Sequence, residues 1–291
     1  MPFPSSAGKE PSVPYTAQIS RSNPTGLIFL LDQSSSMLEP FGRQPEKSKA
    51  AGVADALNRL LQNLVLKCAK ADGIRDFFHV AMLSYGGRVA SAFGGALAGK
   101  GLVPISQIAN NPLRVEVRMR KVDDGAGGLV DEQFKFPVWF EARPTGRTPM
   151  CEALRWAAEG LKVFLGTHPD CYPPIVINIT DGQPSDGDPQ QAASDLRGLG
   201  STDGSVLLFN AHLSDKQNKP AEFPGSEAGL PDQYARLLFR MSSPLPPKLA
   251  EAIRANGVAA GAQARGFMFN ADLVAVVRFL DVGTRVAQGA R

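Results

Sequence analysis

Two apolar runs of strand length, each leading to an aspartate, constrain the fold of this 291-residue chain most strongly. Residues 27–31 lead into Asp32, and residues 175–179 lead through a threonine into Asp181. Runs that lack polar alternation are typical of strands buried on both faces, as in parallel sheets. The loops at the carboxyl ends of such strands are where open α/β sheets bind ligands. We therefore predict an α/β fold that places both aspartates on one edge of a sheet.

Hydroxyl side chains accompany these carboxylates. Ser34 and Ser36 follow Asp32 at alternate positions, and Thr148 stands at the start of a predicted helix over residues 148–165. Carboxylate and hydroxyl oxygens are hard donors, which suit Mg²⁺ or Mn²⁺ better than zinc. Taken by itself, the first motif is equally typical of a strand end followed by helix-capping serines.

The ordered set of motifs resembles a known family. D-x-S-x-S at 32–36, G-x-T-P at 146–149 and T-D-G at 180–182 are similar to the metal-ion-dependent adhesion site of von Willebrand factor A (vWA) domains. The resemblance covers roughly residues 25–285. It implies a doubly wound, mostly parallel central sheet flanked by helices. The metal, Mg²⁺ or Mn²⁺, would be held by all five matching residues: Asp32, Ser34, Ser36, Thr148 and Asp181.

The resemblance also implies how such a site acts. In the family the hydroxyls bind the metal directly, the aspartates often act through waters, and the last helix can slide, which here is the predicted helix 271–280. The dication then attracts an acidic side chain of a partner, so we expect a binding protein and no enzyme. A metal-dependent hydrolase has little support, because no general base or nucleophile is evident beside the motifs.

A narrower resemblance is to bacterial cytosolic stand-alone vWA proteins associated with tellurite resistance, carried by the stretch 264–272. It implies an adaptor or regulator in a stress or defence module with kinase or phosphatase partners. The alternative is a non-ATPase subunit of an AAA+ ATPase-driven metal-insertion or remodelling complex. Neither the partner nor the oligomeric state follows from the sequence.

Composition narrows the classes of function. The formal net charge is only +3, so the electrostatic signature of nucleic-acid binding is missing. The chain has no apolar run of membrane-spanning length, and its proline-containing start lacks the apolar core of a secretory signal. Three cysteines without framework spacing favour a reduced, cytoplasmic protein. We expect a flexible leader over 1–24 and a tail over 286–291.

Alternating patterns predict the remaining elements. Helices are expected over 45–71, 189–199, 233–240 and 245–256, and strands over 77–85, 88–93, 205–213 and 265–270. The link to Thr148 is long, with an insertion over about 94–143. Within it, residues 113–120 and 134–140 alternate, which predicts a β-hairpin over 113–141. We expect one apolar row, including Val115, Val117, Phe134 and Phe136, that packs either on the domain or on a partner.

The chain also contains an incomplete phosphate-loop motif. Residues 94–100 fit the phosphate-loop motif G-x-x-x-x-G-K, but Gly101 follows where a serine or threonine is needed for Mg²⁺. Pro104 also prevents a long helix from starting there. We therefore expect no nucleotide binding by this chain.

Overall fold

A mostly parallel sheet forms the centre of the molecule in the computed structural model, which describes residues 14–270 except 42–43, 124, 126 and 215–218. The strand order is β15-β16-β14-β11-β1-β6-β7. Strands β16, β14, β11, β1 and β6 are parallel, whereas β7 and β15 run antiparallel at the two edges. The strands are β1 (Thr25–Asp32), β6 (Phe78–Tyr85), β7 (Val89–Ser91), β11 (Ile175–Thr180), β14 (Leu207–His212), β15 (Ala221–Glu222) and β16 (Phe267–Phe269).

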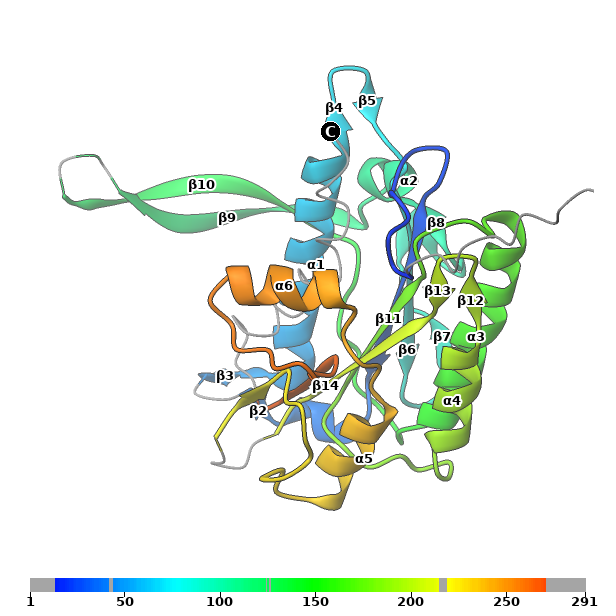
Figure 1. The fold of residues 1–291 in the computed structure, drawn as a ribbon. Helices are drawn as coiled ribbons and strands as arrows, with labels where there is room; N and C mark the ends of the chain where they lie inside the picture. The colour runs from blue at the N-terminus through cyan, green and yellow to red at the C-terminus, as the bar shows by residue number, and fades with distance from the viewer. Residues whose placement is uncertain (1–13, 42–43, 124, 126, 215–218, 271–291) are drawn as a thin grey trace, which may run out of the picture.

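Helices cover both faces of this sheet (Figure 1). The long helix packs on one face together with two short ones, and three helices pack on the other face, so that each face has its own apolar core. This three-layer arrangement confirms the predicted fold class. The first set is α1 (Lys49–Cys68), α2 (Ile105–Asn110) and α6 (Pro247–Ala255); the second is α3 (Met150–Thr167), α4 (Gln190–Gly198) and α5 (Gln233–Met241).

The element boundaries depart from the sequence predictions at α1 and in the insertion. Helix α1 begins at Lys49 because the Ser48 side chain caps it by accepting a hydrogen bond from Ala51 N. The residues just before it form a two-stranded ribbon instead. Helix α2 was not predicted. The small elements are η1 (Ser35–Leu38), β2 (Pro40–Phe41), β3 (Gln44–Ser48), β4 (Ala69–Lys70), β5 (Gly73–Ile74), η2 (Gly95–Leu97), β8 (Val103–Pro104), β12 (Gly200–Ser201) and β13 (Gly204–Ser205).

The predicted leader packs on the domain from residue 14 onward. The Asp203 carboxylate accepts hydrogen bonds from Thr16 N and Ala17 N, each at 2.9 Å. Ile19 is 2% exposed and belongs to the core on the α1 face. The expectation of a flexible leader therefore does not hold for residues 14–24. The predicted helix 271–280 and the tail lie outside the described residues.

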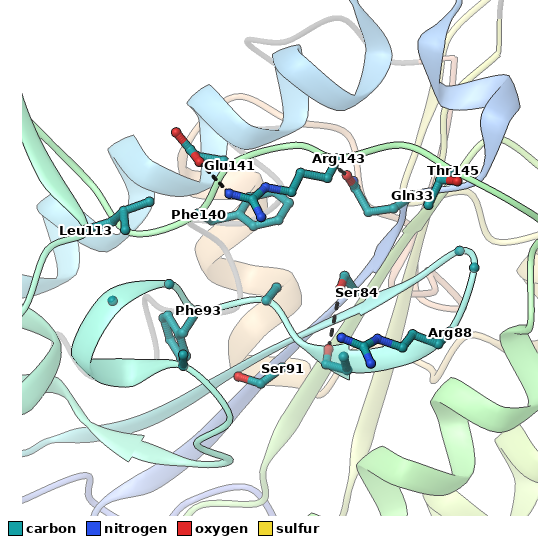
Figure 2. Close-up of a pocket in the computed structure, with 17 residues that line it drawn as sticks. Gln33, Ser84, Arg88, Ser91, Phe93, Leu113, Phe140, Glu141, Arg143 and Thr145 are labelled. Atoms are coloured by element: carbon teal, nitrogen blue, oxygen red, sulfur yellow. Dashed lines mark hydrogen bonds and ion pairs between the residues drawn. The ribbon is translucent and has the colours of Figure 1, made fainter.

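The insertion returns to the domain beside the edge strand. After the hairpin, residues 139–145 run past β7 on the way to α3 (Figure 2). Asn58 of α1 fastens the start of this segment, because its side-chain oxygen accepts from Trp139 N at 2.8 Å and its amide donates to Phe140 O at 2.9 Å. This returning segment sets the path of the chain toward Thr148.

The hairpin, β9 (Arg114–Asp123) and β10 (Leu129–Val138), projects from the body across α1 (Figure 1). Its predicted apolar row is wrong. The register pairs Phe134 with Arg118 and Val117 with Lys135, and paired residues share a face. The phenylalanines therefore lie on the arginine face, and the valines lie on the other.

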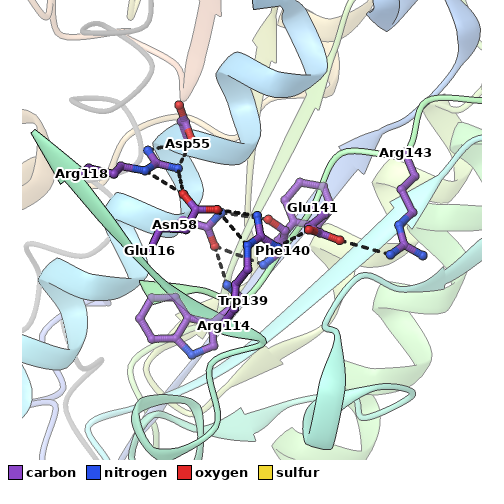
Figure 3. Close-up of polar contacts among 9 residues, drawn as sticks. All are labelled: Asp55, Asn58, Arg114, Glu116, Arg118, Trp139, Phe140, Glu141 and Arg143. Carbon is purple, nitrogen blue, oxygen red and sulfur yellow. Dashed lines mark hydrogen bonds and ion pairs between the residues drawn. The ribbon is translucent and has the colours of Figure 1, made fainter. Parts of the chain in front are cut away.

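The base of the hairpin packs on the domain through the arginine face. Phe136 is 1% exposed, with the Arg118 guanidinium 3.7 Å from its ring centroid. Arg118 also pairs with Asp55 of α1 at 3.2 Å (Figure 3). Val117 and Met119 on the opposite face remain 67% and 55% exposed. The valines of the predicted row are therefore exposed, whereas the ring of Phe136 is covered by the stacked guanidinium of Arg118.

Candidate metal centre

The first loop of the site begins where β1 ends. Asp32 is 1% exposed, and each of its carboxylate oxygens accepts a hydrogen bond. Oδ1 accepts from Ser34 N at 2.8 Å, and Oδ2 accepts from the Thr180 hydroxyl at 2.6 Å. Since Thr180 ends the neighbouring strand β11, the carboxylate is held between two parallel strands at their carboxyl ends, as predicted.

Hydroxyl groups join this loop to the third motif. The Ser34 and Ser36 Oγ atoms are 3.0 Å apart. Ser36 in turn donates a hydrogen bond to Asp181 Oδ1 at 2.8 Å. Ser36 and Asp181, which are 145 residues apart in sequence, therefore meet at one point on the sheet edge. Asp32, Ser34, Ser36 and Asp181 form a single hydrogen-bonded cluster.

Thr148 lies at the same edge because its loop forms hydrogen bonds with the loop after β1 and with the loop after β11. Gly146 O accepts from Ser35 N at 3.2 Å, and Thr145 N donates to Gln33 O at 2.6 Å. Thr148 N donates to the Ser185 hydroxyl at 3.0 Å, in the loop that follows Asp181. Thr148 is 8% exposed. The structure thus places all five predicted residues on three mutually bonded loops.

A buried lysine that the sequence analysis missed enters this cluster. Lys49 is 3% exposed, and its ammonium bonds to Asp181 Oδ2 at 3.2 Å and to Glu39 Oε2 at 2.6 Å. Burial disfavours its charge, but the bond to Glu39 and the charge of Asp181 outweigh burial and raise the pKa of Lys49. A sequence signal existed, because Lys49 falls at helical spacing from the apolar face of Val53 and Leu57.

The electrostatics of the cluster are those of crowded carboxylates. Burial raises the pKa of Asp32 to about 6, against hydrogen bonds from Ser34 and Thr180 that lower it. The nearby charge of Asp181 raises it further. A divalent cation would relieve this repulsion, and the donors are carboxylate and hydroxyl oxygens only. The residues present therefore fit Mg²⁺ or Mn²⁺.

A buried polar chain crosses the sheet beneath the site and also escaped the sequence analysis. The Tyr85 hydroxyl donates to Asn178 Oδ1 at 2.6 Å, and the Asn178 amide donates to Asn210 Oδ1 at 3.0 Å. The Asn210 amide donates to Ser242 Oγ at 2.9 Å. The chain links β6, β11, β14 and the end of α5. It holds β11, the strand that leads to Asp181, in position relative to β6 and β14.

Comparisons with known proteins concern the fold. The sequence matches no protein-family profile and no curated protein. Among solved structures, the chain is similar to manganese-loaded TRAP protein of Plasmodium vivax, at 16% identity and a TM-score of 0.43, over 89% of this chain and 72% of that one. It is also similar to a von Willebrand factor type A protein of Catenulispora acidiphila, at 12% identity and a TM-score of 0.48.

That second match covers 91% of this chain and 43% of the other. A third, the ArnB paralog VWA2 of Sulfolobus acidocaldarius, has 14% identity and a TM-score of 0.37 over 69% of this chain and 37% of that one. The chain thus spans less than half the length of the latter two proteins. All three comparisons bear on the fold alone.

Two negative findings complete the description of residues 14–270, its gaps excepted. None of the helices in this part of the chain is both long and apolar enough to cross a membrane. The same residues contain no cluster of three or more histidine, cysteine, aspartate or glutamate side chains placed to hold a metal. The candidate site differs from such clusters because hydroxyls supply most of its donors.

Proposed function

We propose that this chain is a metal-dependent protein-binding domain that recognises an acidic side chain of a partner. The ion, Mg²⁺ or Mn²⁺, is held by Asp32, Ser34, Ser36, Thr148 and Asp181. The observation that carries the proposal is the hydrogen-bonded bridge from Asp32 through Ser34 and Ser36 to Asp181. It assembles oxygen donors from distant segments at the edge where open α/β sheets bind ligands.

Each residue has a distinct task in this proposal. The three hydroxyls are neutral donors, which leave a bound dication with charge to attract a further anion. Asp32 orients Ser34 through its backbone amide, and Asp181 orients the Ser36 hydroxyl. When bound, the ion supplies a Lewis-acidic centre that a partner carboxylate completes.

We further propose binding without catalysis. The ammonium of Lys49 is committed to two carboxylates, and therefore it does not serve as a base at the site. The resemblance suggests a setting, a bacterial cytosolic stress or defence module with kinase or phosphatase partners. An AAA+ ATPase complex is the alternative. Both settings remain predictions from the sequence.

Calorimetry with Mn²⁺ tests the metal site. Asp32→Ala and Asp181→Ala should each weaken binding at least about tenfold, since each removes a charged group that orients a donor. Asp195→Asn is the matched control, because Asp195 lies exposed on α4 and its carboxylate accepts a hydrogen bond from the Gln191 side chain, away from the site. Circular dichroism establishes that the variants fold. Unchanged Mn²⁺ affinity in both site variants would overturn the assignment.

A further inference from the structure

A pocket of about 480 Å³ lies beside the candidate metal centre. One wall is the edge strand β7 with the turns at its two ends, and the other is the returning segment 140–145 of the insertion (Figure 2). Its floor is apolar, since Phe93 and Phe140 are each 3% exposed. Pockets of this size and mixed lining are typical of ligand sites.

Two arginines extend into the pocket from opposite walls (Figure 2). Arg88 stands at the turn between β6 and β7, is exposed, and has no hydrogen-bond or ion-pair partner among the described residues. Arg143 comes from the returning segment, and its side chain is 82% exposed with one bond to Glu141 Oε2 at 3.1 Å. The lining thus holds two guanidiniums and one carboxylate, and that carboxylate, Glu141, also pairs with Arg114 outside the pocket.

Close packing of backbone joins the pocket to two loops of the candidate metal site, those that carry Ser34 and Thr148. A Cβ on Gly86 would lie 2.5 Å from Gln33 O and 2.6 Å from Thr145 O. A Cβ on Gly146, whose φ is +76°, would lie 2.7 Å from Gly87 Cα. Glycine is therefore required at both positions, and the turn after β6 touches the loops that carry Ser34 and Thr148.

Gln33 belongs to both sites. It lies between Asp32 and Ser34, is 4% exposed, and lines the pocket. Its side-chain oxygen accepts from Arg143 N at 2.7 Å, and its backbone N donates to Tyr85 O at 2.7 Å. The segment that carries Arg143 is thus bonded directly to the first metal loop. A ligand that bridges pocket and metal would need only a short reach.

We propose that this pocket binds a second acidic side chain, carried by an extended segment of the same protein partner whose carboxylate completes the metal site. The proposal rests on the proposed function. A carboxylate suits this excess of guanidinium over free carboxylate in the lining, and Arg88 and Arg143 both offer charged hydrogen-bond donors to it. An extended segment suits the wall, because β7 is the edge strand of the sheet and such edges add strands.

The test uses an acetylated, amidated hexapeptide with two aspartates at alternate positions, and its asparagine counterpart. Binding to the full chain is followed by fluorescence anisotropy with Mn²⁺ and with EDTA, and by NMR of the arginine Nε–H groups with diamagnetic Mg²⁺ and with EDTA. Arg88→Gln should weaken binding of the aspartate peptide about tenfold or more, the loss typical of a hydrogen bond to a charged group. The signals of Arg88 and Arg143 should shift on binding.

Arg155→Gln is the matched control, since Arg155 is an exposed arginine on α3 whose side chain has no hydrogen bond or ion pair among the described residues. Equal loss in both variants, or equal affinity for the aspartate and asparagine peptides, overturns the proposal. A phosphoserine peptide that binds where the aspartate peptide does not overturns the choice of carboxylate.

The two proposals fail differently. Binding that persists in EDTA and depends on Arg88 supports the pocket even where the metal site fails. Metal-dependent peptide binding that keeps its affinity in Arg88→Gln contradicts the proposed pocket but agrees with the proposed metal site.

Discussion

Lys49 sets the charge of the candidate metal centre as much as its aspartates do. Its buried ammonium shares the Asp181 carboxylate that a metal would also attract. A cation built into the protein beside a metal site lowers affinity for the metal, because like charges repel strongly where water is excluded. The hydrogen bond to Glu39 keeps the ammonium in place at the end of η1.

Replacing this lysine should tighten metal binding. We expect Lys49→Met to raise Mn²⁺ affinity about tenfold or more, since one charge-assisted hydrogen bond to Asp181 no longer competes. Calorimetry measures the change. Lys47→Met is the matched control, because Lys47 pairs with Asp55 away from the site. Weaker Mn²⁺ binding in Lys49→Met would mean instead that the lysine holds Asp181 in its binding position.

His79 makes stability depend on pH. Burial lowers the pKa of His79, and the neighbouring His168 lowers it further, with the two ring centroids 5.3 Å apart. The charge of Asp76 acts in the opposite direction and raises this pKa. Below its ordinary value of about 6.5 the unfolded chain takes up a proton that the folded chain resists. The free energy of unfolding should therefore fall as pH drops from about 7 to 5. Urea titrations should show a shallower fall in His79→Leu; an identical pH profile would contradict this account.

Among the elements, the β9–β10 hairpin divides into an anchored base and a projecting end. At the base, Phe136 and Val138 are buried, and Arg118 links the ribbon to α1. Beyond Arg118 the ion pairs Arg120–Glu132 and Lys121–Asp131 are exposed. Exposed pairs of this kind contribute little to stability, whereas a buried phenylalanine contributes several kcal/mol.

A shortened hairpin should therefore fold as well as the full one. Replacing residues 119–133 by Asn-Gly joins the paired residues Arg118 and Phe134 through a two-residue turn. We expect the free energy of unfolding to change by less than about 1 kcal/mol. Phe136→Ala, in contrast, should cost about 3–5 kcal/mol. Urea denaturation measures both, and a large loss in the shortened chain would show that the projecting end stabilises the core.

At the scale of the whole molecule, the candidate metal site joins elements on both faces of the sheet to two of its central strands. Lys49 begins α1 on one face, Thr148 precedes α3 on the other, and Asp32 and Asp181 end adjacent central strands. A ligand held by all of these binds the folded chain and not the unfolded one. Its binding is therefore linked to global stability.

Saturating Mn²⁺ should raise the melting temperature by a few degrees. An ion at 100 times its dissociation constant adds about 2.7 kcal/mol of stability, and EDTA should reverse the shift. Differential scanning calorimetry of the full chain measures it, with Asp181→Ala as the comparison. A shift of equal size in that variant would place the stabilising ion elsewhere.

The sequence by itself determined the central strands, most of the helices and the three motifs that meet at the candidate metal site. Unbroken apolar runs such as 27–31 identify buried strands, and strands of this kind carry their aspartates to one edge whatever the loops do. Helix spans followed from the spacing of apolar residues, and the start of α1 was placed too early because the Ser48 cap was overlooked. The hairpin was predicted from its alternation, because a period of two depends only on neighbouring residues.

Tertiary structure decided the contacts between segments that are distant in the chain. The register of the hairpin depends on its turn, so the pairing of Phe136 with Glu116 was beyond a pattern of alternation. The ion pair of Lys49 with Asp181 joins residues 132 apart, and the pocket beneath Arg88 exists because the insertion returns beside β7. Such contacts arise when separate elements pack together, and no local pattern records which of them will meet.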